Sequence, residues 1–312
     1  MRELGTFMLL AAVVAAGPTQ PGSAVPTTAP AAEQAPQSVA IPFAPPLGQP
    51  LRYRLVREAT RGGRPQRTEV MFLVSFRRSG GDYVMSVRLE LPPGVPAPSA
   101  SSAISLIFSR PTEFRLTAAG EIVELLDMEA HWAAGERAVA EMTGQRAIDP
   151  SARQAVVGMI AQIRALPPEA QLELFARNVA PIVAAAGVEL TVGEELRESG
   201  MAHSILGSLM QNATVRLDGV DGRIARLSGR STVSSEELEA ATRELVARLA
   251  PSRQDALGFR IVSNELTEAY EVSLETGLTE RYRTEKVVVT EADGTTGRAT
   301  EVQTLERVRS LR

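Results

Sequence analysis

The sequence is 312 residues long, contains no cysteine and carries a formal net charge of −4 at pH 7. Without cysteine the chain has neither a disulfide framework nor the acylated cysteine of a lipoprotein signal. The mild negative charge, the lack of a basic block and an aromatic content of 4% argue against nucleic-acid binding and against a carbohydrate groove built from aromatic platforms.

The first residues are typical of an export signal. Arg2 provides a positive start, and Thr6–Ala16 forms an apolar stretch that is too short to span a bilayer comfortably. Gly22-Ser23-Ala24 then fits the small-x-small pattern of a cleavage site. We therefore expect a signal peptide over residues 1–24, a periplasmic or secreted protein, and no stable transmembrane span after cleavage. A short uncleaved anchor or an incorrectly assigned start is the alternative.

The segment after the signal is rich in Pro, Ala, Ser, Thr and Gln. Such a composition does not bury enough apolar surface to offset the entropy of ordering the chain. We therefore expect residues 25–46 to form a disordered tether, with Ile41 and Phe43 as its large apolar residues. The remainder, residues 47–312, is long enough for a single domain. Its basic residues are nearly all Arg, and this bias together with abundant Ala suggests a GC-rich bacterial genome.

The clearest structural signal is the stretch Leu51–Leu91. It contains two runs with period-two alternation, which predicts strands with one apolar and one polar face. The turn sequence Ser79-Gly80-Gly81-Asp82 separates them, and the shorter run Leu51–Leu55 predicts a further strand. The apolar positions of the two runs are Val70, Phe72, Val74 and Phe76, and then Tyr83, Met85, Val87, Leu89 and Leu91.

The middle of the chain changes from strand to helix. Ile104–Phe108 predicts a strand and Phe114–Leu125 a hairpin, whereas Asp127–Thr143 has a helical pattern. A second helix is expected from Asp149-Pro150-Ser151 to the stop at Pro167-Pro168. A third follows from residue 172 to residue 183 and is kinked or shortened by Pro181. Together these helices form an insertion at about 127–187.

The last part of the chain returns mainly to strands. Expected are a strand and turn at Leu190–Leu196, a hairpin across residues 214–229, a helix from Ser234 or Ser235 to about Leu249, and three strands between Arg260 and Val308. Strands, helices, strands, helix and strands in this order predict an α+β fold. We expect a curved, mostly antiparallel, half-barrel-like sheet covered by the inserted helical segment.

The sequence contains no pattern of an enzyme active site. It lacks a nucleophile elbow, a phosphate loop and a dinucleotide fingerprint, so no catalytic residue, cofactor or enzymatic activity is expected. Asp127 and His131 stand four residues apart, but a zinc site needs further ligands, and a surface histidine that pairs locally is the preferred interpretation. His203 beside Ser204 does not make a triad, because triad partners meet through the fold.

The apolar face of the sheet is the candidate ligand-binding surface. Its residues either form an ordinary core or line a lipid-sized cavity, and the pattern is the same in both cases. The candidate ligand-binding residues are Phe72, Phe76, Met85, Phe114, Leu116, Tyr270 and Val272.

The order of elements and three short segments resemble the periplasmic lipoprotein-carrier half-barrels of the LolA, LolB and LppX type and related exported β proteins. The segments are Phe114–Val123 (FRLTAAGEIV), Leu190–Leu196 (LTVGEEL) and Leu274–Glu280 (LETGLTE). The resemblance implies an envelope protein that binds an apolar ligand, such as a lipid or acyl chain, between sheet and helices. The alternative is a non-catalytic structural or interaction module of the envelope, which docks another envelope protein through the polar strands of Leu278–Val308.

Overall fold

A computed structural model of the chain describes residues 37–61, 64–90, 110–145, 157–158, 160–161, 163–204, 207–249, 259–292 and 295–308. The strands are β1 (Ser38–Ala40), β2 (Leu51–Arg61), β3 (Arg64–Ser79), β4 (Asp82–Glu90), β5 (Thr112–Leu116), β6 (Ile122–Leu125), β7 (Glu189–Thr191), β8 (Glu195–Ser204), β9 (Gly207–Asp221), β10 (Ile224–Val233), β11 (Phe259–Ser273), β12 (Thr279–Ala292) and β13 (Thr295–Val308). The helices are α2 (Met128–Gln145), α4 (Pro168–Ala176), α5 (Ser235–Leu249) and the 3₁₀ turn η1 (Ala180–Ile182).

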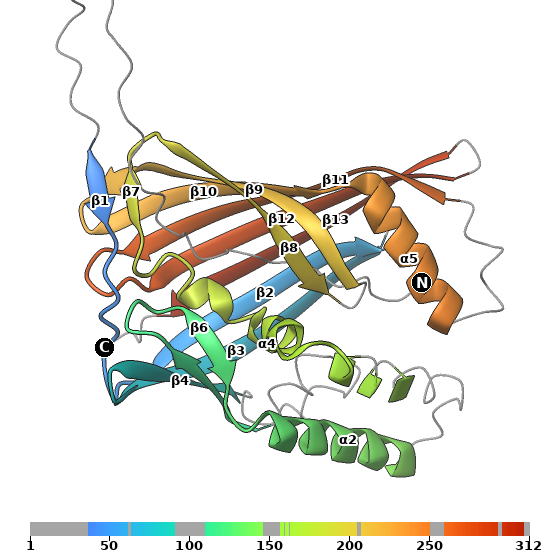
Figure 1. Cartoon of the computed structure of the whole chain (residues 1–312), viewed down its shortest axis with the longest axis horizontal. Coiled ribbons are helices and arrows are strands. Elements are labelled where there is room, and N and C mark those ends of the chain that lie inside the picture. The colour runs from blue at the N-terminus through green and yellow to red at the C-terminus, as the bar shows by residue number, and fades with distance from the viewer. Residues whose placement is uncertain are drawn as a thin grey trace, which may run out of the picture.

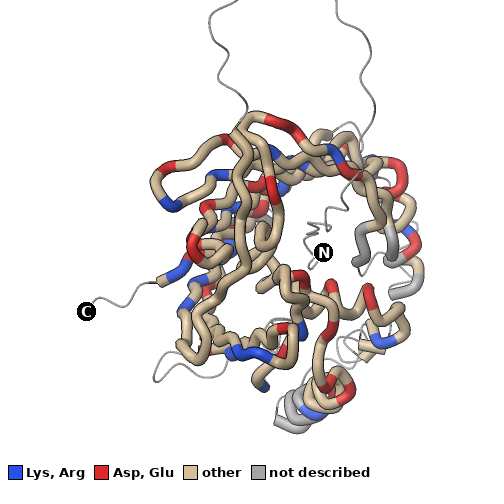
Figure 2. Tube along the Cα trace, turned by 60° about the vertical axis from the view of Figure 1, so that its left-hand side comes forward, with Lys and Arg blue, Asp and Glu red and all other residues tan. Residues whose placement is uncertain are grey.

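The main sheet has eleven strands in the order β6-β5-β4-β3-β2-β13-β12-β11-β10-β9-β8, and every neighbouring pair is antiparallel. Strand β2 pairs with β13, so the first and last strands of the sheet join the two halves of the chain. The sheet curls so that β9–β13 form one wall and β2–β4 the opposite wall (Figures 1 and 2). It does not close, because β6 and β8 do not pair with each other in the described chain.

This architecture confirms the expected α+β class and the curved antiparallel sheet covered by helices. The alternation in β3 and β4 places Phe72, Val74 and Phe76 on the inner face, with the turn at Gly80 (φ 64°) between the strands. The helices expected at Asp127 and Ser235 are also present as α2 and α5. The strand expected at Ile104–Phe108 and the helix start at Asp149 lie outside the described residues.

Two segments differ from the expectation. Residues from 37 onward belong to the fold rather than to the tether, because β1 pairs with β7 and Ile41 is 1% exposed. Three apolar side chains, Val39, Ile41 and Phe43, alternate along this segment and reach the core. Strand β8 was expected only as far as Leu196 but continues to Ser204, because it pairs with β9 along its whole length.

The interior of the sheet contains two apolar clusters. The larger lies at the end that carries β1 and β7, where inner strand residues pack against Val179, Ile182 and Val183 from the segment around η1. The smaller lies under α5 and joins Leu238 of that helix to Leu209 and Ile261 of the sheet. The concave face is therefore apolar at both ends.

Helices α2 and α4 lie along the open side of the sheet. Helix α4 contacts both β6 and β8, the two edge strands, and so bridges the opening (Figure 1). Trp132 Nε1 of α2 donates to Gln171 Oε1 of α4 at 3.0 Å, and Gln171 Nε2 donates to the Leu166 carbonyl at 2.8 Å. This buried network fastens α2 to α4.

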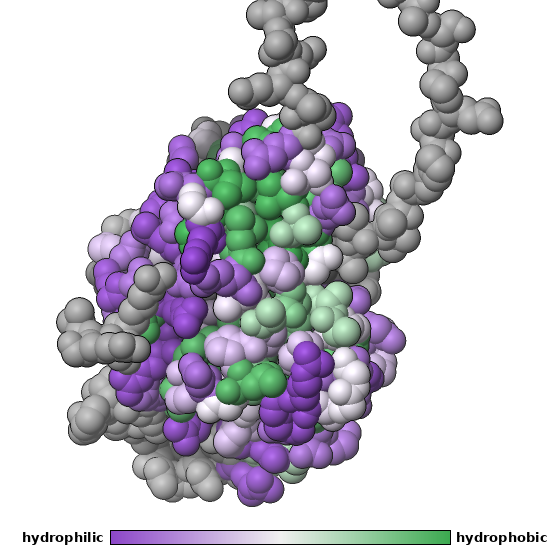
Figure 3. Space-filling view, turned by 90° about the vertical axis from the view of Figure 1, so that its left-hand side faces the viewer, coloured by the Kyte–Doolittle hydropathy of each residue, from purple (hydrophilic) through white to green (hydrophobic). Residues whose placement is uncertain are grey.

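The outer surface is mixed in character. Acidic and basic residues are scattered over the trace without a large region of one sign (Figure 2). The end that carries β1 and β7 displays hydrophobic surface bordered by hydrophilic residues (Figure 3). Among the described helices, none combines the length and the hydropathy that a membrane span requires.

Candidate functional site: the concave face of the sheet

The seven candidate ligand-binding residues come together in the larger apolar cluster. All are nearly inaccessible, with exposures between 0% and 5%. The register pairs Met85 with Phe76 on one side and with Phe114 on the other, so these side chains form one continuous inner wall. This wall packs against the chain's own residues around η1. Its role in holding a ligand stays a prediction.

A polar cluster lies on the same concave face, next to this wall and toward α5. Strand register places Arg57, Gln303, Thr284 and Glu268 in one row across β2, β13, β12 and β11. The next row contains Glu301 and Lys286. Arg177, at the C-terminus of α4, interacts with the same charges from the helical side. We call the following residues the interior polar cluster: Arg57, Arg177, Glu268, Thr284, Lys286, Glu301 and Gln303.

Arg57 and Glu301 form a bidentate ion pair in this cluster. Nε and one terminal nitrogen of Arg57 each donate to a different carboxylate oxygen of Glu301 at 2.8 Å. The two side chains are 26% and 13% exposed. Two parallel, charge-assisted hydrogen bonds away from bulk water hold both groups in place. The pair therefore neutralises itself and fixes the middle of the cluster.

Glu268 is buried below two tyrosines. Tyr282 Oη and Tyr270 Oη donate to the same carboxylate oxygen at 2.8 Å and 3.1 Å. Burial raises the pKa of Glu268, and the two tyrosine hydrogen bonds only partly oppose this. Burial and the neighbouring carboxylate raise the pKa of both tyrosines, which remain protonated donors.

Lys286 and Arg177 carry the cationic character of the cluster. Burial, and then the nearby guanidinium of Arg177, lower the pKa of Lys286 to about 8, although Glu301 opposes the shift. Burial and then Arg57 likewise lower the pKa of Arg177 to about 10. Both side chains remain protonated at pH 7. The cluster thus holds three basic groups against Glu301 and a Glu268 whose pKa is raised.

Several buried polar atoms of this region lack a hydrogen-bond partner. Gln303 Nε2 is one of them, and its side chain belongs to a residue that is 4% exposed. Gln211 Oε1, on β9, is another, in a residue that is 3% exposed. Buried polar atoms are normally paired with protein or water, so such atoms indicate a place for water or a ligand. Both lie on the concave face.

A hollow opens beside Lys286, between the polar cluster and α5. It encloses about 20 Å³, enough for roughly one water molecule, and about 340 Å³ when the space open to solvent is included. Lys286 and Gln211, whose amide oxygen is unpaired, both line this hollow. The lining residues are Gln211, Ser231, Thr232, Val233, Leu238, Asn264, Glu265, Leu266 and Lys286.

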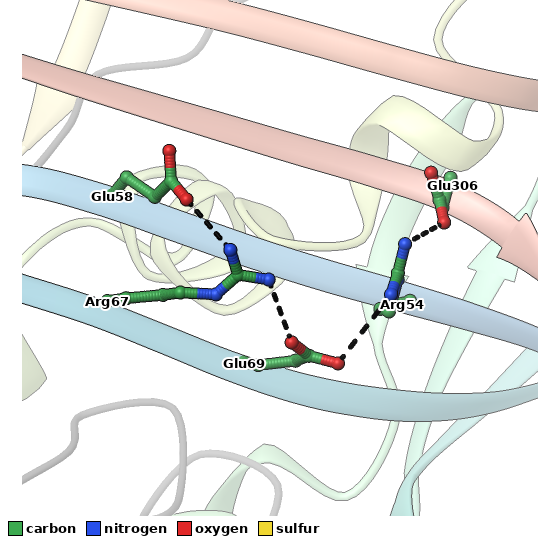
Figure 4. A network of polar contacts seen from close by, with 5 residues as sticks. All are labelled: Arg54, Glu58, Arg67, Glu69 and Glu306. Atoms are coloured by element: carbon green, nitrogen blue, oxygen red, sulfur yellow. Dashed lines mark hydrogen bonds and ion pairs between the residues drawn. The ribbon is translucent and has the colours of Figure 1, made fainter.

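The convex face carries a second hollow at the seam of β2 and β13. Its charged side chains pair with one another, as Figure 4 shows: Arg67 contacts Glu58 at 3.0 Å and Glu69 at 3.1 Å, and Arg54 contacts Glu306. Exposed pairs of this kind contribute at most about 1 kcal/mol each. This surface belongs to the polar face that the period-two alternation of the strands predicts.

The histidines do not assemble a site in the described chain. His131 is 4% exposed and its ring lies 5.8 Å from that of Phe175, so it is a buried residue and the expected surface position is wrong. The side chain of His203 lies outside the described residues. The described residues include no group of three or more His, Asp or Glu that is arranged to hold a metal ion.

The interior polar cluster was missed at the sequence level, although the alternation contained a signal for it. Arg57 has the same parity as Leu51, Tyr53 and Leu55, and Glu268 stands between Leu266 and Tyr270 on the apolar face of its strand. A charged residue at an inward position is the exception that identifies a buried polar site. The expected docking edge is also corrected: over residues 301–306, β13 is paired with β12 on one side and with β2 on the other, so this part of the strand is no free edge.

No family model and no curated protein matches the chain. A structure described as "Lipid-protein interactions in lipovitellin" aligns with 89% of this chain at 9% identity and a TM-score of 0.41, and the chain spans 26% of that protein. A second structure is described as "Crystal Structure of Rv2717c from M. tuberculosis". Its alignment covers 82% of this chain and 91% of the chain in that structure, at 10% identity and a TM-score of 0.20. At these TM-scores neither structure indicates a function for this chain. The fold class is α+β, dominated by an open, curved antiparallel sheet.

Proposed function

We propose that this chain is an exported bacterial envelope protein that binds an apolar or amphiphilic ligand, such as a lipid or acyl chain, on the concave face of its sheet. The observation that supports the proposal most strongly is the opening between β6 and β8, which is bridged by α4 and not by strand pairing. Helix α4 has no backbone ladder to the sheet, so its displacement breaks side-chain contacts without disrupting a strand.

The apolar wall supports the same function. Phe72, Met85 and Phe114 are covered by the chain's own segment around η1, which occupies the position that an acyl chain would take. Movement of α4 and η1 would expose this wall to a ligand while the sheet remains intact. The side-chain hydrogen bond from Thr279 Oγ1 to the Pro181 carbonyl, at 2.6 Å, is one contact that such a movement would break.

Native mass spectrometry of the purified protein, before and after addition of palmitate, tests the proposal. We expect a species heavier by one ligand. Trp132 offers a second readout because it is the single tryptophan and packs against Phe175 of α4 at a ring distance of 5.2 Å. Ligand entry under α4 should shift its fluorescence to longer wavelength, whereas absence of both the bound species and the shift would contradict the proposal.

A double variant serves as the control for ligand that adsorbs to the outer surface of the protein. Met201 and Met210 face each other across β8 and β9 on the convex side and are 45% and 43% exposed. The variant Met201→Ser with Met210→Ser removes this exposed apolar pair. Binding that persists in the variant is binding elsewhere, and loss of binding would assign it to this surface and overturn the interior site.

A further inference from the structure

We propose that the interior polar cluster binds an oxyanion, a carboxylate or phosphate group, between Lys286, Arg177 and the amide of Gln303. Where the proposed function holds, this group is the acidic head of an amphiphile whose chain lies along the apolar wall. The inference therefore deepens the proposed function, but it rests on a separate set of residues.

The charge balance of the cluster favours an anion. Arg57 and Glu301 neutralise each other through two hydrogen bonds of 2.8 Å. Glu301 also acts on Lys286 and Arg177, so the cluster as a whole has three basic groups, Arg57, Arg177 and Lys286, and two carboxylates, Glu301 and Glu268. The carboxylate of Glu268 accepts hydrogen bonds from the hydroxyls of Tyr270 and Tyr282. A buried surplus of positive charge is costly unless a counter-ion accompanies it.

The unpaired amide of Gln303 is the second, independent observation. Its residue stands in the row between Arg57 and Thr284, and it is 4% exposed with no acceptor for Nε2. Leaving a buried N–H unpaired is costly, and an oxyanion is the acceptor that an N–H donor among cations fits best.

The position of the cluster agrees with an amphiphile. It lies on the concave face between the larger apolar cluster and the smaller one under α5. The hollow beside Lys286 connects it to solvent. Glu265 also borders this hollow, but its carboxylate is paired with Arg230 at 3.0 Å. An acidic head would thus reach Lys286 from the solvent side while its chain follows the apolar residues.

Lys286 is the single lysine of the sequence, so a label that reacts with amines reports on this side chain. Reductive methylation with ¹³C-formaldehyde labels this side chain and the N-terminus alone, and the methylated amine keeps its charge. The labelled lysine reports its own protonation by NMR. Addition of dodecyl phosphate at pH 7 should move the resonance and raise the pH at which it titrates, because an oxyanion stabilises the charged amine.

The variants separate the cluster from the rest of the surface. Lys286→Met should weaken binding of dodecyl phosphate about tenfold or more, the effect of losing one charge-assisted hydrogen bond. Lys286→Arg should restore it. Arg67→Gln removes one positive charge from the convex face, where Arg67 is 57% exposed, and should leave the affinity unchanged. Circular dichroism establishes that each variant is folded, and the titration of the labelled wild-type protein does not depend on the variants.

The affinity should also fall as pH rises. Lys286 faces Glu301 on β13, Arg57 on β2, Arg177 after α4 and Glu268 two positions along on β11. Since its pKa lies near 8, wild-type affinity should fall between pH 7 and pH 9.5, whereas that of Lys286→Arg should change less. An equal fall in both proteins would overturn the assignment of this lysine.

Three ligands distinguish the possible outcomes. If dodecyl phosphate binds more tightly than dodecanol, the site recognises the head group of an amphiphile. If inorganic phosphate moves the resonance of Lys286 and dodecyl phosphate does not, the anion site is supported and the proposed function is contradicted. If dodecyl phosphate and dodecanol bind with equal affinity, and if both affinities are the same in Lys286→Met as in the wild-type protein, the oxyanion site is overturned. The proposed function would then still stand. No response of Lys286 to either phosphate compound would overturn the inference directly.

Discussion

At the scale of single residues, the stability of the sheet interior depends on the positions of a few charged residues and glycines. Arg57, Glu268 and Lys286 occupy inward positions that neighbouring strands fill with apolar side chains. Each is tolerated because a specific partner or electrostatic environment compensates for its burial. The same residues therefore determine how stability responds to pH.

Lys286 should make the protein more stable as pH rises. Its folded pKa of about 8 lies below the value near 10.4 of an unfolded chain, so the unfolded state binds more protons between these values. Unfolding free energy should increase by about 2 kcal/mol between pH 7 and pH 9.5. Urea denaturation across this range measures the slope, and Lys286→Met should flatten it. An identical slope in the variant would show that another group is responsible.

Gly277 should be required for folding because it stands where the turn between β11 and β12 meets the N-terminal segment. Its φ is 71°, and a Cβ there would lie 1.7 Å from the carbonyl oxygen of Pro42. Gly277→Ala should therefore destabilise by more than about 2 kcal/mol, from backbone strain and the clash together. The matched control is Gly222→Ala, with φ 60° and no atom within 4 Å, which should cost only about 1 kcal/mol. Thermal denaturation of both compares the two costs, and equal losses would refute the close approach.

At the scale of elements, α4 is the one that decides whether the concave face is accessible. It is short, begins with Pro167-Pro168, and bridges β6 and β8 without backbone pairing to either. Its attachment depends on the buried Trp132–Gln171 network and on apolar contacts such as Phe175. A helix held in this way can separate from the sheet at a lower cost than a paired strand.

Substitution of Gln171 should loosen this attachment. Gln171→Leu removes the oxygen that accepts from Trp132 and the amide that donates to the carbonyls of Arg164 and Leu166. It should lower the free energy of unfolding by about 2–3 kcal/mol. Glu169→Gln, an exposed change in the first turn of the same helix, should cost less than about 1 kcal/mol. Urea denaturation and hydrogen exchange across α4 give the comparison. A neutral effect of Gln171→Leu would mean that the network does not hold the helix.

At the scale of the whole molecule, the pairing of β2 with β13 unites the two halves of the chain. Residues about 250 positions apart in sequence become neighbours there, as with Leu55 and Leu305. The larger apolar cluster likewise takes residues from both halves and from the helical segment. A shared core and a shared sheet favour unfolding in one step.

Single-step unfolding can be followed with two probes. Trp132 reports on the interface of α2 and α4, and far-ultraviolet circular dichroism reports mainly on the sheet. We expect coincident midpoints in urea, because the helices and both walls share one core. A tryptophan transition at clearly lower urea concentration would show instead that the helical cover separates before the sheet unfolds.

The sequence by itself determined the strands, their turns and the antiparallel class, because period-two alternation and Gly-containing turns such as Ser79–Asp82 are local signals. It also brought out the apolar wall around Phe72 and Phe114. Only the tertiary structure decided that β2 closes onto β13, that residues 37–46 belong to the fold, and that Arg57, Lys286 and Glu268 meet on the concave face. These outcomes depend on the register between strands far apart in the chain. The alternation shows that a charge stands at an inward position, but which of these charges meet depends on their cross-strand neighbours.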